Sequence, residues 1–258
     1  EREKNSNQII LVSIFVNPLQ FSEGEDFTKY PRNINKDAEL AFLAGADAIW
    51  APDYIEVFPG GEDSHFKIQV PPTLSNKLCG AERKGHFDGV ATVIIRLIKI
   101  IKPDKLILGE KDWQQLIIIR KLFQELSIPI RIESFATQRD QNGFAYSSRN
   151  SYLSNSERLN AQTLPKIIQE AKDDFVKDKE ISLQKIESKL KQSNLEIEYI
   201  KIVDAFSLKE RDNINGICLL AAAVKCGSTR LIDHTFLMKR KPIIAIDGPA
   251  GAGKSTVT

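Results

Sequence analysis

The sequence predicts an α/β protein with a doubly wound parallel sheet and a second, smaller α+β domain. Apolar, strand-like runs alternate with amphipathic helical segments between residues 9 and 135, which is typical of a parallel sheet covered by helices. Beyond residue 151 the pattern changes to a long, charged helical stretch followed by further strands. Hydrophobic residues make up 42% of the 258 residues and charged residues 27%, as expected of a globular chain with a sizeable core.

The first half contains the elements of the expected parallel sheet. The run "IILVSIFV" (9–16) is apolar and rich in β-branched residues, which predicts a strand covered on both faces. Residues 53–87 are rich in Gly, Pro and charge and predict a long excursion with one strand near 66–70. The other expected strands span 47–52, 103–109 and 129–135, and the expected helices span 34–46, 88–101 and 110–126.

The second half predicts a different unit. Residues 154–192 have helical spacing, with Ser154 and Glu157 placed as a capping box and Pro165 expected to kink the helix. Strands follow within 197–205 and 217–234. We therefore divide the chain into three predicted parts. These are a ligand-binding α/β domain (1–150), a small domain (151–238), and a linker that leads into a fresh strand and a glycine-rich loop (239–258).

Composition narrows the class of protein. A net charge of +2 is too small to indicate a nucleic-acid or membrane partner. The three cysteines form no CxxC pair and no apolar run approaches the roughly 18 residues of a membrane span, so reduced thiols and a cytoplasmic location are expected. The chain begins at Glu1 and its single methionine is Met238, which we interpret as a fragment cut at both ends.

The closing "GPAGAGKST" matches the phosphate-binding pattern GxxxxGK[ST] and follows the strand-like run "IIAID". Glycines let backbone N–H groups converge on phosphate, the lysine neutralises its charge, and the serine would ligate magnesium. The alternative is a glycine-rich loop that matches by chance. Because no Walker-B acid or lid follows, we expect the start of a second nucleotide-binding domain. Its residues are Gly248, Gly251, Gly253, Lys254, Ser255 and Thr256.

A second candidate site lies in the body of the chain, where "GEKD" (Gly109, Glu110, Lys111 and Asp112) connects a predicted strand to a helix. Ligands of open α/β sheets bind at the carboxyl ends of the strands, and a helix N-terminus attracts anions. Lys111 is therefore a candidate phosphate contact. A solvated helix start with acidic residues would produce the same letters, and this motif alone leaves both interpretations open.

Glutamines accompany this motif. Gln20 follows the first predicted strand, and Gln114 and Gln115 occupy the first turn of the helix after "GEKD". Neighbouring residues on a helix point about 100° apart, so at most one of the latter pair is expected to face a site. The amides of Gln20 and Gln115 can hold a small carboxylate or hydroxyl without adding charge.

Hydroxyls and an arginine cluster in "YSSRN", where Tyr146, Ser147, Ser148 and Arg149 suit a triphosphate. A helix-capping turn would use the same residues and is equally compatible. His86 has no cysteine or second histidine at ligand spacing, so it is interpreted as a loop-ordering residue or a contact at a helix N-terminus. The neighbouring Arg83 is a candidate second phosphate contact.

The motifs "VSIFVNPLQF", "YPR", "GHFDGV", "LGEKDWQQL", "SSRN" and "STRLID", in this order and spacing, closely resemble those of pantothenate synthetases (pantoate–β-alanine ligases). The likeness extends from about residue 9 to 234 and implies a nucleotidyltransferase-like Rossmann fold. "IAIDGPAGAGKST" resembles the amino-terminal loop of cytidylate kinases. Together they resemble a bifunctional ligase and kinase.

The resemblance implies that pantoate attacks the α-phosphate of ATP to give pantoyl-adenylate, which β-alanine then converts to pantothenate. It implies ATP and Mg²⁺, CMP as substrate of the kinase part, and a possible homodimer, with no metal ligand assigned. Lys111 and Arg149 would be catalytic, and Gln20 and Gln115 would hold pantoate. The implied ATP-binding residues are Gly109, Glu110, Lys111, Asp112, Gln138, Tyr146, Ser147, Ser148 and Arg149. The smaller domain would cover the site.

The chain departs from the family pattern in three places. It lacks the upstream "PTMGxLHxGH" segment, and Tyr146 and Lys84 replace commoner residues. We therefore expect little or no ligase activity from the chain as given, although its parent would have it. Two other functions stay open: an adenylate-forming nucleotidyltransferase that acts on another acid, and a non-catalytic nucleotide-binding module.

Overall fold

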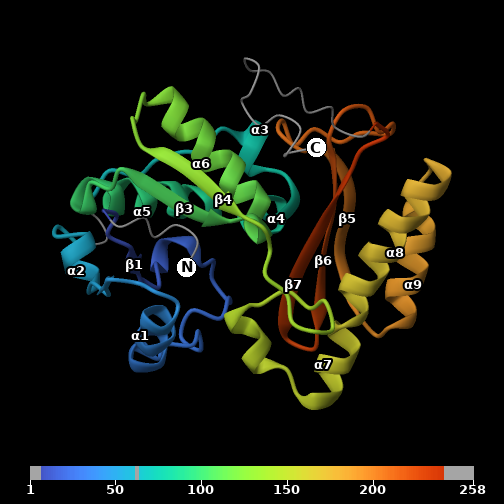
Figure 1. Cartoon of the computed structure of the whole chain (residues 1–258), viewed down its shortest axis with the longest axis horizontal. Coiled ribbons are helices and arrows are strands. Elements are labelled where there is room, and N and C mark those ends of the chain that lie inside the picture. The colour runs from blue at the N-terminus through green and yellow to red at the C-terminus, as the bar shows by residue number, and fades with distance from the viewer. Residues whose placement is uncertain (1–6, 62–63, 241–258) are drawn as a thin grey trace, which may run out of the picture.

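A helix-flanked parallel α/β region is followed by an antiparallel three-stranded sheet with its own helices (Figure 1). The computed structural model describes residues 7–61 and 64–240. The first region contains β1 (Leu11–Ser13), η1 (Pro18–Gln20), α1 (Ile34–Leu43), β2 (Ala48–Trp50), α2 (Tyr54–Val57), α3 (Pro72–Ser75), α4 (Leu78–Glu82), α5 (His86–Ile101), β3 (Lys105–Gly109), η2 (Glu110–Asp112), α6 (Trp113–Glu125) and β4 (Arg131–Phe135). The second contains η3 (Ser148–Tyr152), α7 (Asn155–Ala161), α8 (Thr163–Asp178), α9 (Leu183–Gln192), β5 (Glu196–Asp204), β6 (Cys218–Cys226) and β7 (Thr229–Leu237).

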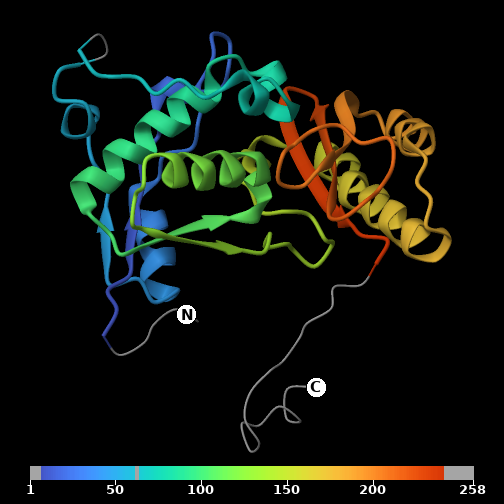
Figure 2. The same ribbon diagram turned by 90° about the horizontal axis from the view of Figure 1, so that it is seen from above.

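The parallel α/β architecture predicted for the first half is confirmed. β1 pairs with β2 and β3 with β4, each pair being parallel, as βαβ connections require. Helix α6 runs along one face of the β3–β4 pair (Figure 2). It packs against α5 through a core that includes Val90, Ile98, Ile119 and Phe123.

Strand β1 is shorter and more exposed than its sequence predicts. Only Leu11–Ser13 is a strand, and Leu11 is 37% exposed. Leu11 and Ser13, which lie on the same face of the strand, are both exposed. The prediction of a strand buried on both faces is therefore wrong.

The predicted strand near residues 66–70 is also wrong, and α5 provides the reason. The backbone N–H of Ile68 donates to Thr92 Oγ1 at 2.9 Å, and that of Val70 donates to Asp88 Oδ1 at 2.8 Å. Side chains of a helix thus satisfy backbone groups that a strand would have paired with another strand.

Three helices replace the single long helix expected over 154–192. The capping box is present, since Ser154 Oγ accepts from Glu157 N at 3.3 Å and Glu157 Oε2 accepts from Ser154 N at 2.9 Å. The first break falls at Gln162, and Pro165 lies in the first turn of α8 instead of kinking a continuous helix. A first-turn N–H has no intrahelical partner, so proline is tolerated there.

The β5–β6–β7 sheet is buried on both faces. On one face Leu220, Ala222 and Val224 of β6 belong to the core formed with α8 and α9. On the other face Leu219, Ala221 and Ala223 pack in a core with Trp113 and residues of α3 to α6. This second core joins the antiparallel sheet to the α/β region.

Two further observations concern the chain as a whole. No helix within residues 7–61 and 64–240 combines the length and apolarity needed to cross a bilayer. The predicted strand at 243–247 and the P-loop residues Gly248, Gly251, Gly253, Lys254, Ser255 and Thr256 lie outside the described residues.

Candidate functional site

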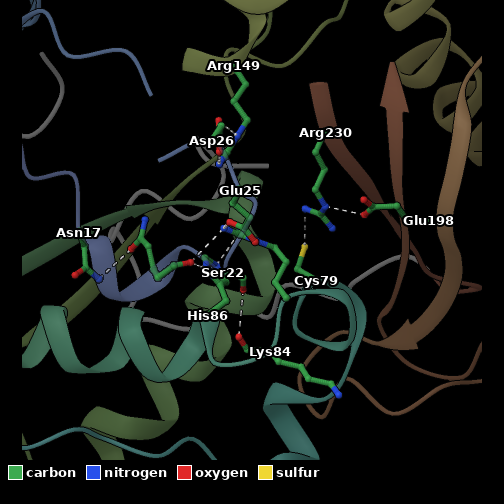
Figure 3. A network of polar contacts seen from close by, with 12 residues as sticks. Asn17, Ser22, Glu25, Asp26, Cys79, Lys84, His86, Arg149, Glu198 and Arg230 are labelled. Carbon is green, nitrogen blue, oxygen red and sulfur yellow. Dashed lines mark hydrogen bonds and ion pairs between the residues drawn. The ribbon is translucent and has the colours of Figure 1, made fainter. Parts of the chain in front are cut away.

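A cleft of about 960 Å³ lies where the α/β region meets the antiparallel sheet. One wall comes from the loop after η1, from α4 and from the junction of η2 with α6. The other comes from the segment around η3 and from β5 and β7. Figure 3 shows polar side chains from the loop after η1 and from α4, η3, β5 and β7 gathered in this region. The volume falls within the range usual for small-molecule sites.

The "NPLQF" motif is fixed against helix α5. Asn17 is 1% exposed, and its Nδ2 donates to the carbonyl of Gly89 at 3.1 Å. A Cβ on Gly89 would lie 2.1 Å from the carbonyl oxygen of Leu19, so only glycine lets the helix approach the loop this closely. Gln20 does not line the cleft in the described structure. Its side chain accepts from Asn17 Nδ2 at 3.4 Å.

His86 orders this loop, as the sequence indicated. Its Nδ1 lies 2.7 Å from the carbonyl of Gln20, and its Nε2 lies 3.0 Å from Nη1 of Arg83. A carbonyl only accepts and a guanidinium only donates, so Nδ1 carries the proton and Nε2 accepts. Burial, reinforced by the Arg83 charge, lowers the pKa of His86 to about 4. The imidazole is therefore neutral near pH 7.

The four residues of "GEKD" do not act as a unit. Gly109 closes β3, and Glu110 Oε1 accepts a hydrogen bond from Ser134 Oγ at 2.8 Å instead of lining the cleft. Lys111 and Asp112 do line the cleft. Within the described residues no carboxylate lies within ion-pair distance of Lys111, which leaves its ammonium available to an anion.

Gln114 and Gln115 both line the cleft, so the expectation that at most one of them faces it is not borne out, but their contacts differ. Gln114 is 5% exposed, and its Nε2 donates to the carbonyls of Leu74 and Lys77 at 2.9 and 2.7 Å. This side chain therefore ties α6 to the α3–α4 segment. Gln115 lies in the cleft wall.

The "YSSRN" segment lines the cleft and also forms the capping turn that was its alternative interpretation. Ser147 Oγ accepts from the N–H of Arg149 at 3.3 Å at the start of η3. Upstream, the N–H of Tyr146 donates to the carbonyl of Gln138 at 3.0 Å. Gln138 itself does not line the cleft, whereas Tyr146, Ser147, Ser148 and Arg149 do.

A buried ion pair fastens this segment to the antiparallel sheet. Nη1 and Nη2 of Arg139 donate to the two carboxylate oxygens of Asp233 at 2.7 Å each. The Asp233 side chain is 3% exposed. Arg139 also bridges to Ala145, so β7 fixes the turn that carries Tyr146 into the cleft.

Two acidic residues that sequence reasoning missed hold the candidate arginines. Asp26 accepts from Arg149 Nε and Nη2 at 2.8 and 2.7 Å, and Glu25 accepts from Arg83 Nε and Nη2 at 2.8 and 2.5 Å. Burial opposes ionisation of both carboxyls, but the arginine hydrogen bonds and charges outweigh it and lower both pKa values. Their only sequence signal is a group of three acids, Glu23, Glu25 and Asp26, between "NPLQF" and "YPR".

A second polar network joins α4 to the sheet. Cys79 Sγ lies 3.2 Å from the hydroxyl of Tyr199, and Arg230 Nε donates to Glu198 Oε2 at 2.7 Å (Figure 3). Arg230 Nη1 also lies 3.7 Å from Cys79 Sγ. Sequence reasoning missed these residues as well, because they come from distant strands. Within the described residues, no group of three or more His, Cys, Asp or Glu side chains could hold a metal ion.

The parallel strands, the helix-start lysine and the covering sheet define a nucleotidyltransferase-like α/β protein. Pantothenate synthetase from Thermus thermophilus superimposes with a TM-score of 0.82 at 33% identity, covering 91% of this chain and 84% of that one. Pantoate-beta-alanine ligase from Francisella tularensis, complexed with beta-gamma ATP and beta-alanine, gives a TM-score of 0.74 at 30% identity over 89% of this chain and 80% of that one.

The Pantoate-beta-alanine ligase family model matches residues 1–236, and the chain belongs to that family. A bifunctional pantoate ligase/cytidylate kinase of Prochlorococcus marinus strain NATL1A is 82% identical over the whole chain. The protein of the same description from another strain of Prochlorococcus marinus is 54% identical over 258 residues. The chain spans about half the length of these curated relatives, at 50% of each.

Proposed function

We propose that this chain forms the ligase part of a protein that condenses pantoate with β-alanine. ATP would first convert pantoate to pantoyl-adenylate with release of pyrophosphate, and the amine of β-alanine would then displace AMP. Membership of the family supports this reaction. The Francisella tularensis structure named above, with beta-gamma ATP and beta-alanine bound, supports the same two ligands here.

The observation that carries the proposal is the convergence of Lys111 and Arg149 on one cleft from different elements of the fold. Attack on the α-phosphate builds negative charge on the phosphate oxygens, and two fixed cations stabilise that charge in a partly water-excluded site. Ser147 and Ser148 add hydroxyl donors beside Arg149. Such a site needs little proton transfer, since it works by holding reactants together.

We assign the remaining ligand contacts from the position of each predicted residue relative to the cleft. Gln115, in the wall, would hold pantoate directly. Gln20 would join it by turning its side chain from Asn17, while its backbone stays held by His86. Gly109 and Glu110 would lie behind the residues that contact ATP, and Gln138 would contact adenine through its backbone.

Mg²⁺ would enter on the phosphates of ATP, which is how proteins usually bind this ion, with one or two carboxylates completing its shell. Asp112, next to Lys111 in the wall, is a suitable carboxylate. The ion would neutralise phosphate charge there.

We also propose the predicted division at residues 150 and 238, with 151–238 as the cover of the site. The glycine-rich end, Gly248–Thr256, would begin a cytidylate kinase that uses CMP, as the names of the relatives suggest. A cytoplasmic location, a possible homodimer and the lack of nucleic-acid and membrane partners complete the proposal.

Equilibrium binding of ATP tests the proposal. Trp113 lies in the cleft wall, so a Trp50→Phe chain reports binding through Trp113 fluorescence alone. Lys111→Met and Arg149→Met should each weaken ATP binding at least about tenfold, the effect of losing a charge-assisted contact. Lys36→Met, on the exposed face of α1, should leave it unchanged. Unaltered binding in both cleft variants would refute the site.

Substrate identity needs a second assay. Because little turnover is expected of the chain as given, AMP release is measured on the full-length parent protein. There it should require both pantoate and β-alanine, and other small acids in place of pantoate should give none. Release that depends on another acid would instead assign the chain to a different adenylate-forming nucleotidyltransferase. ATP binding that no acid alters would indicate a non-catalytic nucleotide-binding module.

A further inference from the structure

Adjacent acids in the loop after η1 occupy the two arginines that a polyphosphate would use. Glu25 and Asp26 each receive Nε and Nη2 of one guanidinium, from Arg83 and Arg149 respectively (Figure 3). Arginine binds phosphate through this same two-pronged edge. A phosphate therefore cannot take that edge of either guanidinium while the carboxylate is in place.

The remaining donors leave little room for a second anion. Arg83 Nη1 faces His86 Nε2 at 3.0 Å, and Arg83 Nη2 also donates to the carbonyl of Gln20 at 3.3 Å. Within the described residues Arg149 keeps only Nη1 without a hydrogen-bond partner. Arg83 must therefore release its carboxylate before it can bind phosphate through two bonds, and Arg149 must release Asp26 before it can offer its Nε–Nη2 edge to phosphate.

The charges that line the cleft also indicate that the two carboxylates must leave before a polyanion binds. Six basic side chains line it: Lys29, Arg83, Lys111, Arg149, Lys225 and Arg230. Six acidic side chains line it as well: Glu25, Asp26, Glu82, Asp112, Glu198 and Asp233. The wall is thus electrically balanced, which is a poor match for a polyanion. Withdrawal of Glu25 and Asp26 would leave two positive charges in excess beside the site.

The loop is built so that its middle can move while its ends stay fixed. The ring of Phe21 packs against Tyr30 and Phe27, with centroids 5.6 and 5.2 Å apart. Between Phe21 and Phe27, residues 22–26 contain turns and bends but no helix or strand, and Ser22 Oγ donates to the carbonyl of Lys84 at 3.3 Å. Release of the two acids from the arginines therefore involves only this short segment between the packed rings.

We propose that Glu25 and Asp26 are specificity-determining residues that compete with polyphosphate for Arg83 and Arg149. A nucleoside triphosphate or inorganic pyrophosphate carries enough charge to displace both carboxylates, whereas a nucleoside monophosphate does not. Return of the acids to the arginines would then favour departure of pyrophosphate. The inference rests on the proposed function, because it assumes that ATP enters this cleft.

Calorimetric titration of the chain with pyrophosphate, MgATP and AMP tests the competition. Asp26→Asn should tighten pyrophosphate and ATP binding about fivefold, because a part-buried ion pair worth about 1 kcal/mol no longer masks Arg149. Glu25→Gln should act similarly at Arg83, and the double variant should exceed tenfold. AMP binding should change less than twofold. Asp26→Glu, which keeps the carboxylate, should remain near wild type.

Glu82→Gln is the matched control. This exposed acid lines the same cleft and, within the described residues, makes no ion pair, so its loss should change pyrophosphate affinity less than twofold. An equal gain in this variant would mean that general charge, and not competition for an arginine, controls binding. Weaker or unchanged binding in both Asp26→Asn and Glu25→Gln would also overturn the proposal, since the acids would then orient the arginines or merely accompany them.

Two further outcomes separate this inference from the proposed function. If Arg149→Met weakens ATP binding and Asp26→Asn does not tighten it, the competition is refuted while the ATP site stands. If the wild-type chain shows no saturable ATP binding, both fail together. Thermal unfolding of each variant checks its fold. Should Asp26→Asn not fold, Glu25→Gln carries the same test at Arg83.

Discussion

The two walls of the cleft are built in opposite ways. In the α/β region the parallel strands have three to five residues and β1 is partly exposed, so loops and helix starts supply most of the wall. In the antiparallel region β5, β6 and β7 have nine residues each, and β6 is buried along almost its whole length. The sheet thus provides a fixed surface, while the groups expected to meet ligand lie on loops that polar contacts hold in place.

The largest expected effect comes from the centre of the fixed wall. Leu220→Ala should lower the free energy of unfolding by about 3 kcal/mol, because the side chain is fully buried between β6 and its helices. Leu11→Ala, in the exposed strand β1, should cost less than about 1 kcal/mol. Urea unfolding measures both. Equal losses would contradict the contrast between the two regions.

The stability of the folded chain should depend on pH through His86, which holds the loop wall in place. Its folded-state pKa of about 4 lies below the ordinary 6.5, so the unfolded chain binds a proton that the folded chain does not. Stability from this group is complete above pH 6.5 and is lost as pH falls toward 4. Between pH 7 and pH 5 the loss should be roughly 2 kcal/mol.

His86→Gln, which cannot titrate, provides the comparison for that pH dependence. Unfolding free energies of both proteins at several pH values should diverge in slope between pH 5 and pH 7. If the wild-type protein and the variant have the same slope there, His86 is not the buried neutral group described above.

The ion pair that holds the segment before η3 to β7 should have a smaller effect. Asp233→Asn removes a buried carboxylate from Arg139, and because that arginine is partly exposed we expect a loss of about 1–2 kcal/mol. ATP binding should weaken as well, since the turn before Tyr146 loses its anchor. Asp174→Asn, in an exposed pair with Lys185, should change stability by less than about 0.5 kcal/mol and leave ATP binding unaltered. A loss of stability without any change in ATP affinity would limit Asp233 to a structural role.

The features of the fold that depend on residues close together in the sequence could be predicted from the sequence. Strand–helix alternation indicated the α/β fold, whereas the 100° step of a helix did not predict that Gln114 and Gln115 both line the cleft. The partners of the arginines could not be predicted, because Arg83 and Arg149 meet their carboxylates across 58 and 123 residues of chain. The exposure of β1 and the hydrogen bonds that Ile68 and Val70 donate to side chains of α5 likewise depend on tertiary neighbours that periodicity does not reveal.

The most direct test of the cleft as an ATP site is a crystal structure of the chain grown with ATP and Mg²⁺. We predict that the triphosphate lies between Lys111 and Arg149, with Ser147 and Ser148 in contact and Asp26 withdrawn from the guanidinium. Triphosphate bound away from both cations would contradict the site. Triphosphate on Arg149 with the Asp26 pair intact would contradict the competition between carboxylate and phosphate.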